Sequence, residues 1–282
     1  MPIKDLRDKK CLLTGAASGI GEATALLATS KGAEVFLTDI NAEGLADTAR
    51  QVVAAGGKVS VAKAIDVADH DAVKTLGDEI HAAHGSMDVV MNIAGISTWG
   101  TVQNLEHEHW RQLVEINLMG PIHVIETFIP PMADAGRGGH LVNVSSAAGL
   151  FGLPWHAAYS ATKFGVRGIS EVLRFDLREH GIGVSLVCPG AVKTPLVGTV
   201  QIVGVDREDP RIQKMVGRFE RRAVRPEQVA EAIVAGVEKN RYMVYSSPDI
   251  RFGHFVQRKF ELPYAIAMRA LNSRISALAK KL

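Results

Sequence analysis

The chain alternates between short apolar runs and longer segments in which apolar residues recur at helical spacing. The short runs are rich in branched side chains and predict buried strands at residues 9–14, 33–38, 58–65, 87–92, 139–146, 181–189 and 241–246. The intervening segments predict helices over residues 20–31, 42–55, 69–84, 106–132, 155–180 and 226–240. This alternation is typical of a Rossmann-type α/β fold, a doubly wound parallel sheet of about seven strands with helices on both faces.

The domain organisation follows from length and from two segments outside the alternation. The 282 residues, 47% of them apolar, can bury one large core, so we expect a single domain over residues 1–248. Residues 194–225 interrupt the alternation. Residues 249–282 follow the last strand as a C-terminal extension.

Charge, cysteine content and hydropathy exclude several functional classes. The net charge of +2 is too small for a nucleic-acid binder, although residues 241–282 carry +6 against −4 for the rest of the chain. Cys11 and Cys188 lie in apolar strands, which predicts free thiols and a cytoplasmic location. No run reaches the ~18 to 20 apolar residues of a membrane span, so we expect no integral membrane segment.

A glycine-rich turn follows the first strand and opens the first helix. It reads Thr14-Gly15-Ala16-Ala17-Ser18-Gly19-Ile20-Gly21. Glycines allow a tight turn with close backbone approach, and the N–H groups at a helix N-terminus favour a pyrophosphate. A turn of this kind alone is weak support for a dinucleotide site, because an ordinary strand-to-helix turn can look the same.

Asp39 strengthens the prediction of a dinucleotide site. It ends the second strand, at the distance along the chain expected of an acid that binds the adenosine ribose. A carboxylate there accepts both ribose hydroxyls and repels a 2′-phosphate, and neither Ile40 nor Asn41 supplies a cation for that phosphate. The residues therefore predict NAD as the cofactor; the alternative is that Asp39 only caps the helix starting near Ala42.

Tyr159 and Lys163 are candidate catalytic residues. Four residues apart in a long helical pattern, they share one helix face. A free tyrosine has a pKa near ~10 and moves protons poorly at neutral pH, but an adjacent ammonium and an oxidised nicotinamide favour the phenolate. A surface pair on an exposed helix is the alternative.

These motifs together resemble the short-chain dehydrogenase/reductase family, in the branch with a TGxxxGxG turn and a YxxxK pair. The resemblance covers residues 9–194, then more weakly the strand near Tyr242. One departure is Ile93, where the family more often has a second Asn. The motifs fall in the family's order, at Thr14 to Gly21, Asp39, Asp66-Val67, Asn92-Ile93-Ala94-Gly95, Asn117, Ser145-Ser146, Tyr159 with Lys163, Pro189-Gly190 and Thr194.

The resemblance implies roles for four catalytic residues. Tyr159 would be the general acid or base on the substrate oxygen, and Lys163 would lower its pKa and hold the nicotinamide ribose. Ser146, rather than Ser145, would bond the reacting oxygen, because it lies thirteen residues before Tyr159. Asn117 would position a water that relays protons from Lys163 to solvent.

The resemblance also implies the contacts of the cofactor. Backbone near the turn would face the pyrophosphate, the ends of the second to fourth strands would hold the adenosine, and residues after Pro189 would close on the carboxamide. The predicted set is Gly15, Ser18, Gly19, Ile20, Gly21, Asp39, Ile40, Asp66, Val67, Asn92, Ala94, Gly95, Tyr159, Lys163, Pro189, Gly190, Val192 and Thr194.

Other candidate groups carry weaker predictions. His107-Glu108-His109 places its histidines on different sides of a helix, and no HExxH or CxxC spacing occurs, so no metal is predicted. Four bulky side chains flank the predicted chemistry and fit either core packing or a pocket wall; these are Trp99, Phe151, Leu153 and Trp155.

Two amphipathic patterns lie outside the motifs. Residues 194–225 follow Pro189-Gly190, where the resemblance implies a lid over the substrate. Within this segment Ile212, Met215, Val216 and Phe219 have helical spacing, so a short amphipathic helix could press an apolar face onto a lipophilic substrate, or onto the core. The tail repeats apolar residues at intervals of four and three, with Arg269, Arg274, Lys280 and Lys281 elsewhere on its surface. This stripe favours packing on the body or a second subunit over contact with an anionic membrane; it comprises Tyr264, Met268, Leu271, Ile275, Leu278 and Leu282.

The sequence therefore predicts an NAD-dependent enzyme that interconverts a secondary alcohol and a ketone on a lipophilic small molecule. A reductase of carrier-bound 3-oxoacyl groups and a non-catalytic cofactor-binding scaffold are the alternatives. Asp39 disfavours the reductase, since similar reductases mostly use NADPH, and the complete catalytic set disfavours the scaffold. The resemblance also implies a homodimer or homotetramer built on the two long helices that begin near Glu106 and Trp155.

Overall fold

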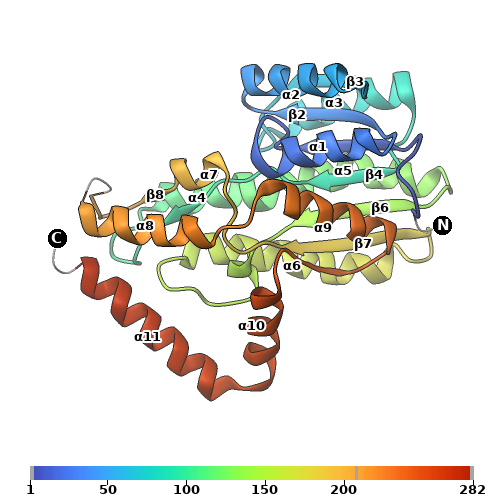
Figure 1. Ribbon diagram of the computed structural model, residues 1–282. Coiled ribbons are helices and arrows are strands. Elements are labelled where there is room, and N and C mark those ends of the chain that lie inside the picture. Colours follow the sequence, from blue (N-terminus) through green and yellow to red (C-terminus); the bar gives the residue numbers. More distant parts are fainter. Residues whose placement is uncertain (1–2, 207–208, 280–282) are drawn as a thin grey trace.

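The computed structural model describes residues 3–206 and 209–279. Within these residues, seven strands form one parallel sheet in the order β3-β2-β1-β4-β6-β7-β9 (Figure 1). This confirms the predicted Rossmann-type fold. The strands are β1 (Lys10–Thr14), β2 (Glu34–Asp39), β3 (Lys58–Ala64), β4 (Val89–Asn92), β6 (Gly139–Val144), β7 (Ile182–Cys188) and β9 (Met243–Tyr245).

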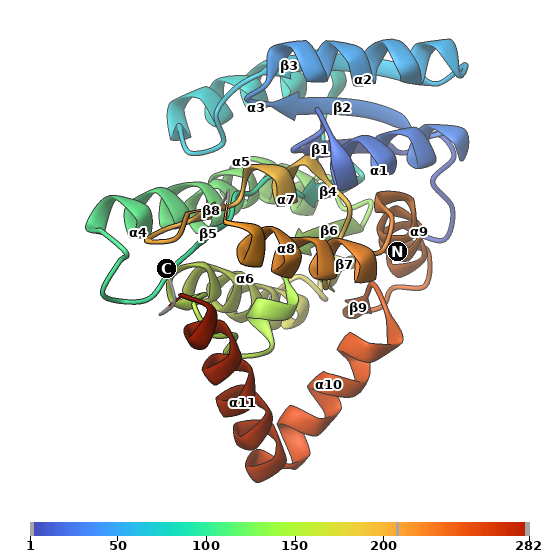
Figure 2. The same ribbon diagram turned by 60° about the vertical axis from the view of Figure 1, so that its left-hand side comes forward.

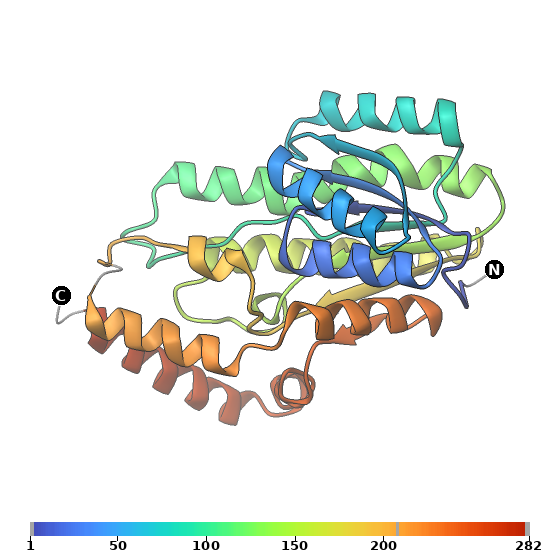
Figure 3. The same cartoon turned by 45° about the horizontal axis from the view of Figure 1, so that its top comes forward.

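Helices cover both faces of the sheet, as Figures 1 and 3 show. One apolar core joins the sheet to α1 (Gly19–Ser30), α2 (Ala42–Ala54) and α9 (Pro226–Glu238). The second core joins the opposite face to α3 (His70–His84), α5 (Gly120–Asp134) and α6 (Ala157–Asp176). Strands buried on both faces must be apolar almost throughout, which explains the continuous runs that predicted them.

The carboxyl ends of the strands meet at one edge. Thr14 pairs with Thr38, and Asp39 with Ala64. Asn92 pairs with Asn143 on the other side of β1. The strand order reverses between β1 and β4, and ligands of open α/β sheets bind in the crevice outside the strands at such a point.

The predicted helix over residues 106–132 is wrong as a single regular helix. The structure has α4 (His107–Val114), a π-helical segment η1 (Glu115–Met119) and α5 in succession. The cause is Pro121, which has no N–H for the carbonyl of Asn117 four residues earlier and whose ring would clash with it. The Gly120 N–H instead donates to the carbonyl of Glu115, five residues back.

The predicted helix over residues 155–180 is too long at both ends. Trp155 has a φ of 66°, in the left-handed region, which excludes it from a right-handed helix. At the other end α6 ends at Asp176, four residues before the predicted end, and Gly181 with a φ of 68° precedes β7.

Residues 194–225 contain the short helix that the spacing of Ile212 to Phe219 indicates, as α8 (Pro210–Arg222). They also contain two elements that periodicity did not predict, α7 (Pro195–Thr199) and β8 (Gln201–Ile202), and β8 pairs in parallel with β5 (Thr98–Trp99). Ile212 is 1% exposed and packs with Val200 and Ile202. The other predicted lid side chains, of Met215, Val216 and Phe219, lie outside those that the structure describes.

The tail folds into α10 (Pro248–Lys259) and α11 (Glu261–Ala279), which form a V that projects from the body (Figure 2). Of the predicted stripe, Tyr264, Met268 and Ile275 are half-buried and Leu271 is 36% exposed. Leu278 and Leu282, with Lys280 and Lys281, lie outside the side chains described. Across the described ranges no helix is long and apolar enough to span a bilayer.

Candidate active site

The glycine-rich turn between β1 and α1 is held in a conformation that needs glycine. Gly15 and Gly19 have φ values of 69° and 56°. A Cβ on Gly15 would lie 2.8 Å from the backbone of Ala94, and one on Gly21 would collide with the carbonyl of Gly15. The turn therefore packs tightly against the end of β4 and leaves backbone exposed at the helix N-terminus, a cradle suited to a pyrophosphate.

Asp39 at the end of β2 is tied to this turn. Its carboxylate accepts from the Ala17 N–H at 3.0 Å and from the Asn41 N–H at 2.8 Å. The cap of α2 is Asn41, whose side chain accepts from the Gly44 N–H at 3.2 Å. The capping role considered for Asp39 is thus taken by another residue, and Asp39 stands beside the pyrophosphate cradle. Ile40 next to it is 70% exposed.

The end of β4 is joined to the turn through Thr14. Its hydroxyl accepts from the N–H groups of Ile93 and Ala94, at 3.0 and 3.1 Å. The Asn92 side chain is buried and donates to Asn143 on β6 at 2.9 Å, so it supports the strand ends. Gly95 is close enough to the catalytic helices that a Cβ would lie 2.9 Å from Asn117 Oδ1 and 3.4 Å from Lys163 Nζ.

Asp66 and Val67 follow β3 at the same edge. Asp66 accepts from the Ala68 N–H at 2.9 Å, and the Val67 carbonyl lies 3.0 Å from His123 Nδ1. Neither residue lines the catalytic cavity described below, and both belong with Asp39 on the side of the sheet where an adenosine would lie.

Tyr159 and Lys163 lie one turn apart on α6, inside the molecule. Lys163 Nζ is 5.7 Å from the centre of the Tyr159 ring and donates to the Val144 carbonyl at 3.2 Å. Burial raises the pKa of the Tyr159 phenol, and a hydrogen bond with the Ser146 side chain opposes that rise. Burial also lowers the pKa of Lys163 to about 8. Both groups titrate in a desolvated site, which is a feature of catalytic centres.

The two neighbouring serines have different environments. The Ser145 hydroxyl is buried and donates to the Lys163 carbonyl at 2.8 Å, where it holds α6 against the end of β6. The Ser146 hydroxyl accepts from the Ala148 N–H at 3.1 Å and reaches the Tyr159 phenol. Of the two serines, Ser146 is therefore the one whose hydroxyl lies next to the Tyr159 phenol.

Asn117 lies in the π-helical segment and is fully buried. Its side chain accepts from the Ile96 N–H at 2.8 Å and donates to the Ile96 carbonyl at 2.9 Å. The amide nitrogen also lies 3.5 Å from the Thr162 hydroxyl. The backbone carbonyl of Asn117 lacks an α-helical donor because residue 121 is proline, so it is free of that bond and can accept one from a water.

A cavity of about 550 Å³ joins these groups. Ser146, Tyr159 and Lys163 line it, together with the predicted cofactor residues Ile20, Gly95, Pro189, Gly190, Val192 and Thr194. Thr194 reaches across to the turn, since a Cβ on Gly19 would lie 2.8 Å from its side chain.

Much of the cavity wall is apolar. Trp99, Phe151 and Leu153 line it, whereas Trp155 packs with Val200 and Ile202 instead. Sequence reasoning missed further lining residues, among them Ile96, His156, Asp249, Ile250 and Leu271. Ile250 and Leu271 belong to the tail, whose Tyr264 hydroxyl accepts from the Gly152 N–H at 2.7 Å.

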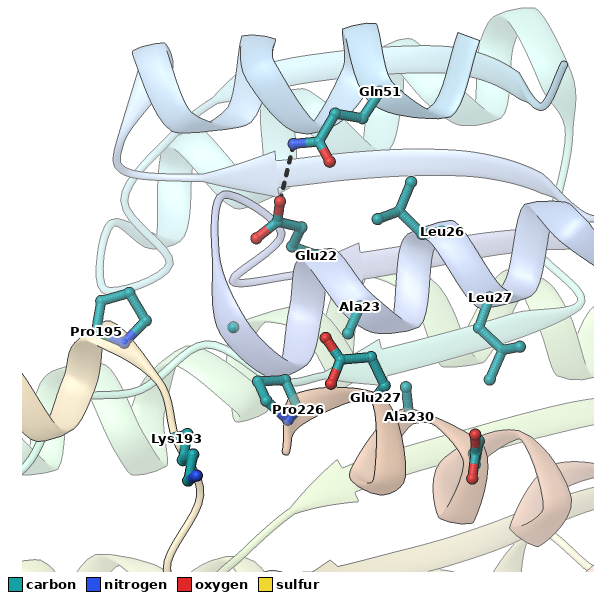
Figure 4. A pocket seen from close by; sticks show the side chains of 12 residues that line it. Glu22, Ala23, Leu26, Leu27, Gln51, Lys193, Pro195, Pro226, Glu227 and Ala230 are labelled. Atoms are coloured by element: carbon teal, nitrogen blue, oxygen red, sulfur yellow. Dashed lines mark hydrogen bonds between the residues drawn. The ribbon is translucent and has the colours of Figure 1, made fainter. Parts of the chain in front are cut away.

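A second hollow of about 560 Å³ lies between α1 and α9 (Figure 4). Glu22 and Glu227 flank it, and Gln51 donates to Glu22 at 2.9 Å. It contains none of the titrating groups of the catalytic cavity. Within the described ranges no group of three or more His, Cys, Asp or Glu side chains could hold a metal ion, and His107-Glu108-His109 forms the first turn of α4.

Comparison with known proteins identifies the family. The sequence model described as "short chain dehydrogenase" matches residues 9–202, more than half of the chain. The chain belongs to the short-chain dehydrogenase family. This short-chain dehydrogenase is therefore a member of an oxidoreductase family, and its fold and ordered motifs agree with that membership.

Curated relatives carry oxidoreductase names. The chain is 35% identical over 233 residues to "Probable oxidoreductase EphD" of Mycobacterium tuberculosis, a match that covers 81% of this chain and 39% of EphD. The short-chain dehydrogenase thus spans about two fifths of that relative. It is also 35% identical over 229 residues to the 3-oxoacyl-[acyl-carrier-protein] reductase FabG of Thermotoga maritima, covering 81% of this chain and 90% of FabG.

Solved structures share the fold of this short-chain dehydrogenase. A short-chain dehydrogenase/reductase from Burkholderia phymatum, solved with NAD, has a TM-score of 0.82 at 27% identity and covers 92% of this chain and 96% of its own. A metagenomic short-chain oxidoreductase, solved with NADP, has a TM-score of 0.68 at 31% identity and covers 85% and 96%.

Proposed function

We propose that this protein is an NAD(H)-dependent oxidoreductase that interconverts a secondary alcohol and a ketone on a lipophilic substrate. The observation that carries the proposal is the placement of Ser146, Tyr159 and Lys163 in one cavity, next to residues of the glycine-rich turn. Similar constellations act by acid–base catalysis beside a nicotinamide, which supplies the hydride acceptor or donor when bound.

In the oxidising direction, Tyr159 as phenolate takes the proton of the substrate hydroxyl. Ser146 donates a hydrogen bond to the same oxygen and fixes its distance from Tyr159. The Lys163 ammonium, whose pKa of about 8 keeps it mostly protonated at pH 7, stabilises the phenolate. The proton then leaves along Lys163 and a water on the Asn117 backbone; in the reducing direction, Tyr159 returns it to the ketone oxygen.

The cofactor residues support NAD over NADP. The turn, Asp39 and the ends of β3 and β4 would hold the adenosine and pyrophosphate, while Val192 and Thr194 would face the carboxamide. Asp39 presents a negative charge where a 2′-phosphate would bind, and Ile40 offers no cation. Family membership leaves the choice open, since one related structure was solved with NAD and another with NADP.

The substrate class follows from the cavity wall. Trp99, Phe151, Leu153, Ile250 and Leu271 present apolar surface beyond the catalytic groups. A ligand that covers such a wall gains by removing apolar area from water, which favours a lipophilic alcohol.

Reduction of carrier-bound 3-oxoacyl groups is the second candidate. It is favoured by the 35% identity to FabG. An assay that compares a 3-oxoacyl carrier substrate and NADPH with hydrophobic alcohols and NAD distinguishes the two. A scaffold without activity has no need of all four residues Asn117, Ser146, Tyr159 and Lys163.

Assembly and location are further parts of the proposal. Exposed apolar side chains on α6, namely Phe164, Val172 and Phe175, support a homodimer or homotetramer built on α4–α5 and α6. The two free and buried cysteines support a reducing compartment, the cytoplasm.

The Tyr159→Phe variant tests the proposed chemistry. We expect it to lose nearly all turnover of a hydrophobic secondary alcohol, at least about 1,000-fold, because removal of the hydroxyl removes the proton acceptor. Fluorescence titration should show unchanged affinity for NADH. Turnover near the wild-type level would refute the proton-transfer role, and a screen of hydrophobic alcohols with NAD, read as absorbance of the reduced nicotinamide, provides the substrate.

A further inference from the structure

His156 is a polar side chain in the substrate part of the cavity that the proposed chemistry does not use. It lies three residues before Tyr159, and its ring lines the cavity. Trp155 before it, with a φ of 66°, turns the chain so that α6 begins immediately after the histidine.

The hydrogen bond of the ring assigns its tautomer. His156 Nδ1 lies 2.7 Å from the Pro154 carbonyl oxygen. A carbonyl oxygen can only accept, so Nδ1 carries the hydrogen. Burial lowers the pKa of the imidazole, which keeps the ring neutral at neutral pH. Nε2 of a neutral ring protonated at Nδ1 is a bare acceptor.

This acceptor has no hydrogen-bond partner among the residues that the structure describes. Among the described residues, some polar side-chain atoms are fully buried and have no hydrogen-bond partner. The indole Nε1 of neighbouring Trp155 is one of these atoms, and His156 Nε2 is not. His156 Nε2 is therefore accessible from the cavity and available to a ligand.

Neighbouring rings fix the orientation of His156. The Trp99 ring lies 4.6 Å away, centre to centre, at an angle of 38°, and the Trp99 indole N–H donates to the Ser97 hydroxyl at 2.8 Å. The Tyr159 ring lies 6.2 Å away at 64°. Packing on two sides and a bond to Pro154 hold the ring in one orientation, as selective recognition requires.

We propose that His156 Nε2 accepts a hydrogen bond from a second hydroxyl group of the substrate, a few bonds from the carbon that is oxidised. The inference rests on the proposed function and narrows its substrate class to lipophilic diols and the corresponding hydroxyketones. An alcohol without the second hydroxyl displaces water from Nε2 and leaves the acceptor unpaired, a loss that discriminates strongly between substrates.

The test compares 1-phenyl-1,2-ethanediol with 1-phenyl-1-propanol, which replaces the second hydroxyl by a methyl group. We expect the wild-type enzyme to prefer the diol by roughly 10- to 100-fold in kcat/KM. The His156→Asn variant keeps an N–H for the Pro154 carbonyl but has no acceptor at the position of Nε2. Its preference should fall to about twofold or less.

Two further variants keep the test decisive. His156→Gln places an amide oxygen near the Nε2 position and should retain part of the preference, and His107→Asn makes the same substitution at an exposed residue and should retain all of it. Wild-type turnover of both alcohols at equal kcat/KM, or an unchanged ratio in His156→Asn, would overturn the role of His156 alone. Absence of turnover of any alcohol by the wild-type enzyme would overturn the proposed function as well.

Discussion

At the scale of single residues, burial acts in opposite directions on the two titrating groups of the cavity. It raises the pKa of the Tyr159 phenol, so the isolated side chain is a weaker acid than free tyrosine. It lowers the pKa of Lys163 to about 8, so the ammonium persists at pH 7 and is lost above pH 8. A positive charge near Tyr159 is therefore needed to produce phenolate at neutral pH, and we propose that Lys163 supplies one.

The role of Asp39 can be measured by cofactor preference. Replacement by Asn keeps an acceptor for the turn but removes the negative charge that repels a 2′-phosphate. We expect the ratio of kcat/KM for NAD to that for NADP to fall about 10-fold or more. Asp47→Asn, on the same side of the molecule but on α2, should leave the ratio unchanged. An unaltered ratio in Asp39→Asn would exclude repulsion of a 2′-phosphate by the Asp39 charge.

His140 makes the fold sensitive to acid. The ring on β6 is fully buried, its Nε2 lies 2.8 Å from the Ser185 hydroxyl, and burial lowers its pKa from 6.5 to about 4. Between these values the unfolded chain binds a proton that the folded chain does not. The contribution of neutral His140 to the free energy of unfolding is therefore fully present above pH 6.5. It falls by about 3 kcal/mol in all as the pH drops toward 4.

Urea unfolding at pH 7 and pH 5 checks this expectation. His140→Asn, whatever its stability at pH 7, should lose about 2 kcal/mol less than the wild type between the two pH values. Equal losses would mean that the ring is charged in the folded protein. The variant difference is the readout, since other histidines titrate in both proteins.

At the scale of elements, the π-helical segment connects the fold to the site. Pro121 breaks the regular ladder, and the opened turn places Asn117 against Ile96, in the loop that follows β4. The side-chain amide of Asn117 thereby provides hydrogen-bond partners for the backbone of Ile96, beside the cavity. The same irregularity leaves the Asn117 carbonyl without an α-helical donor, where a water could bind.

Removal of the Asn117 amide should be costly to stability. Asn117→Ala removes the partners of the N–H and carbonyl of half-buried Ile96, for a loss of about 1 to 3 kcal/mol in the free energy of unfolding. Urea titration measures the loss, and Asn272→Ala on the exposed face of α11 is the matched control. A loss under about 0.5 kcal/mol would show that solvent reaches Ile96.

The elements that the sequence predicted are those with strong local signals. Apolar runs bounded by turn residues gave the seven strands, and ordered motifs indicated Ser146, Tyr159 and Lys163. Apolar residues keep helical spacing on both sides of Pro121, so the periodicity predicted one uninterrupted helix through it. Ile250 and Leu271 carry no local signal, because only the packing of α10 and α11 against the loop at Gly152 brings them to the cavity. His156 belongs to none of the ordered motifs, and the turn at Trp155 that places it at the start of α6 has no periodic pattern.

At the scale of the whole molecule, the tail has two surfaces. Ile250 and Leu271 face the cavity, while Phe252, Leu262 and Ile266 are 68%, 69% and 56% exposed. Exposed apolar side chains gathered on projecting helices mark an interaction surface. A second subunit is the occupant we favour, and an anionic membrane is the alternative.

Serine substitutions on the exposed tail surface separate these occupants. The triple variant Phe252→Ser, Leu262→Ser, Ile266→Ser should have a smaller mass by light scattering than the intact chain, because the subunit contact loses apolar area. Val53→Ser with Val102→Ser, also exposed but outside the tail, should leave the mass unchanged. The membrane would be favoured if the triple variant and the intact chain had equal masses and only the intact chain co-sedimented with anionic phospholipid vesicles.

The position of Ile250 and Leu271 after the last strand of the sheet has a consequence for protein engineering. The residues proposed to move protons lie before residue 195, whereas part of the proposed substrate cavity is formed by residues after 247. A chimaera that exchanges only the two terminal helices between relatives would therefore transplant substrate choice while it leaves the reaction chemistry with the recipient.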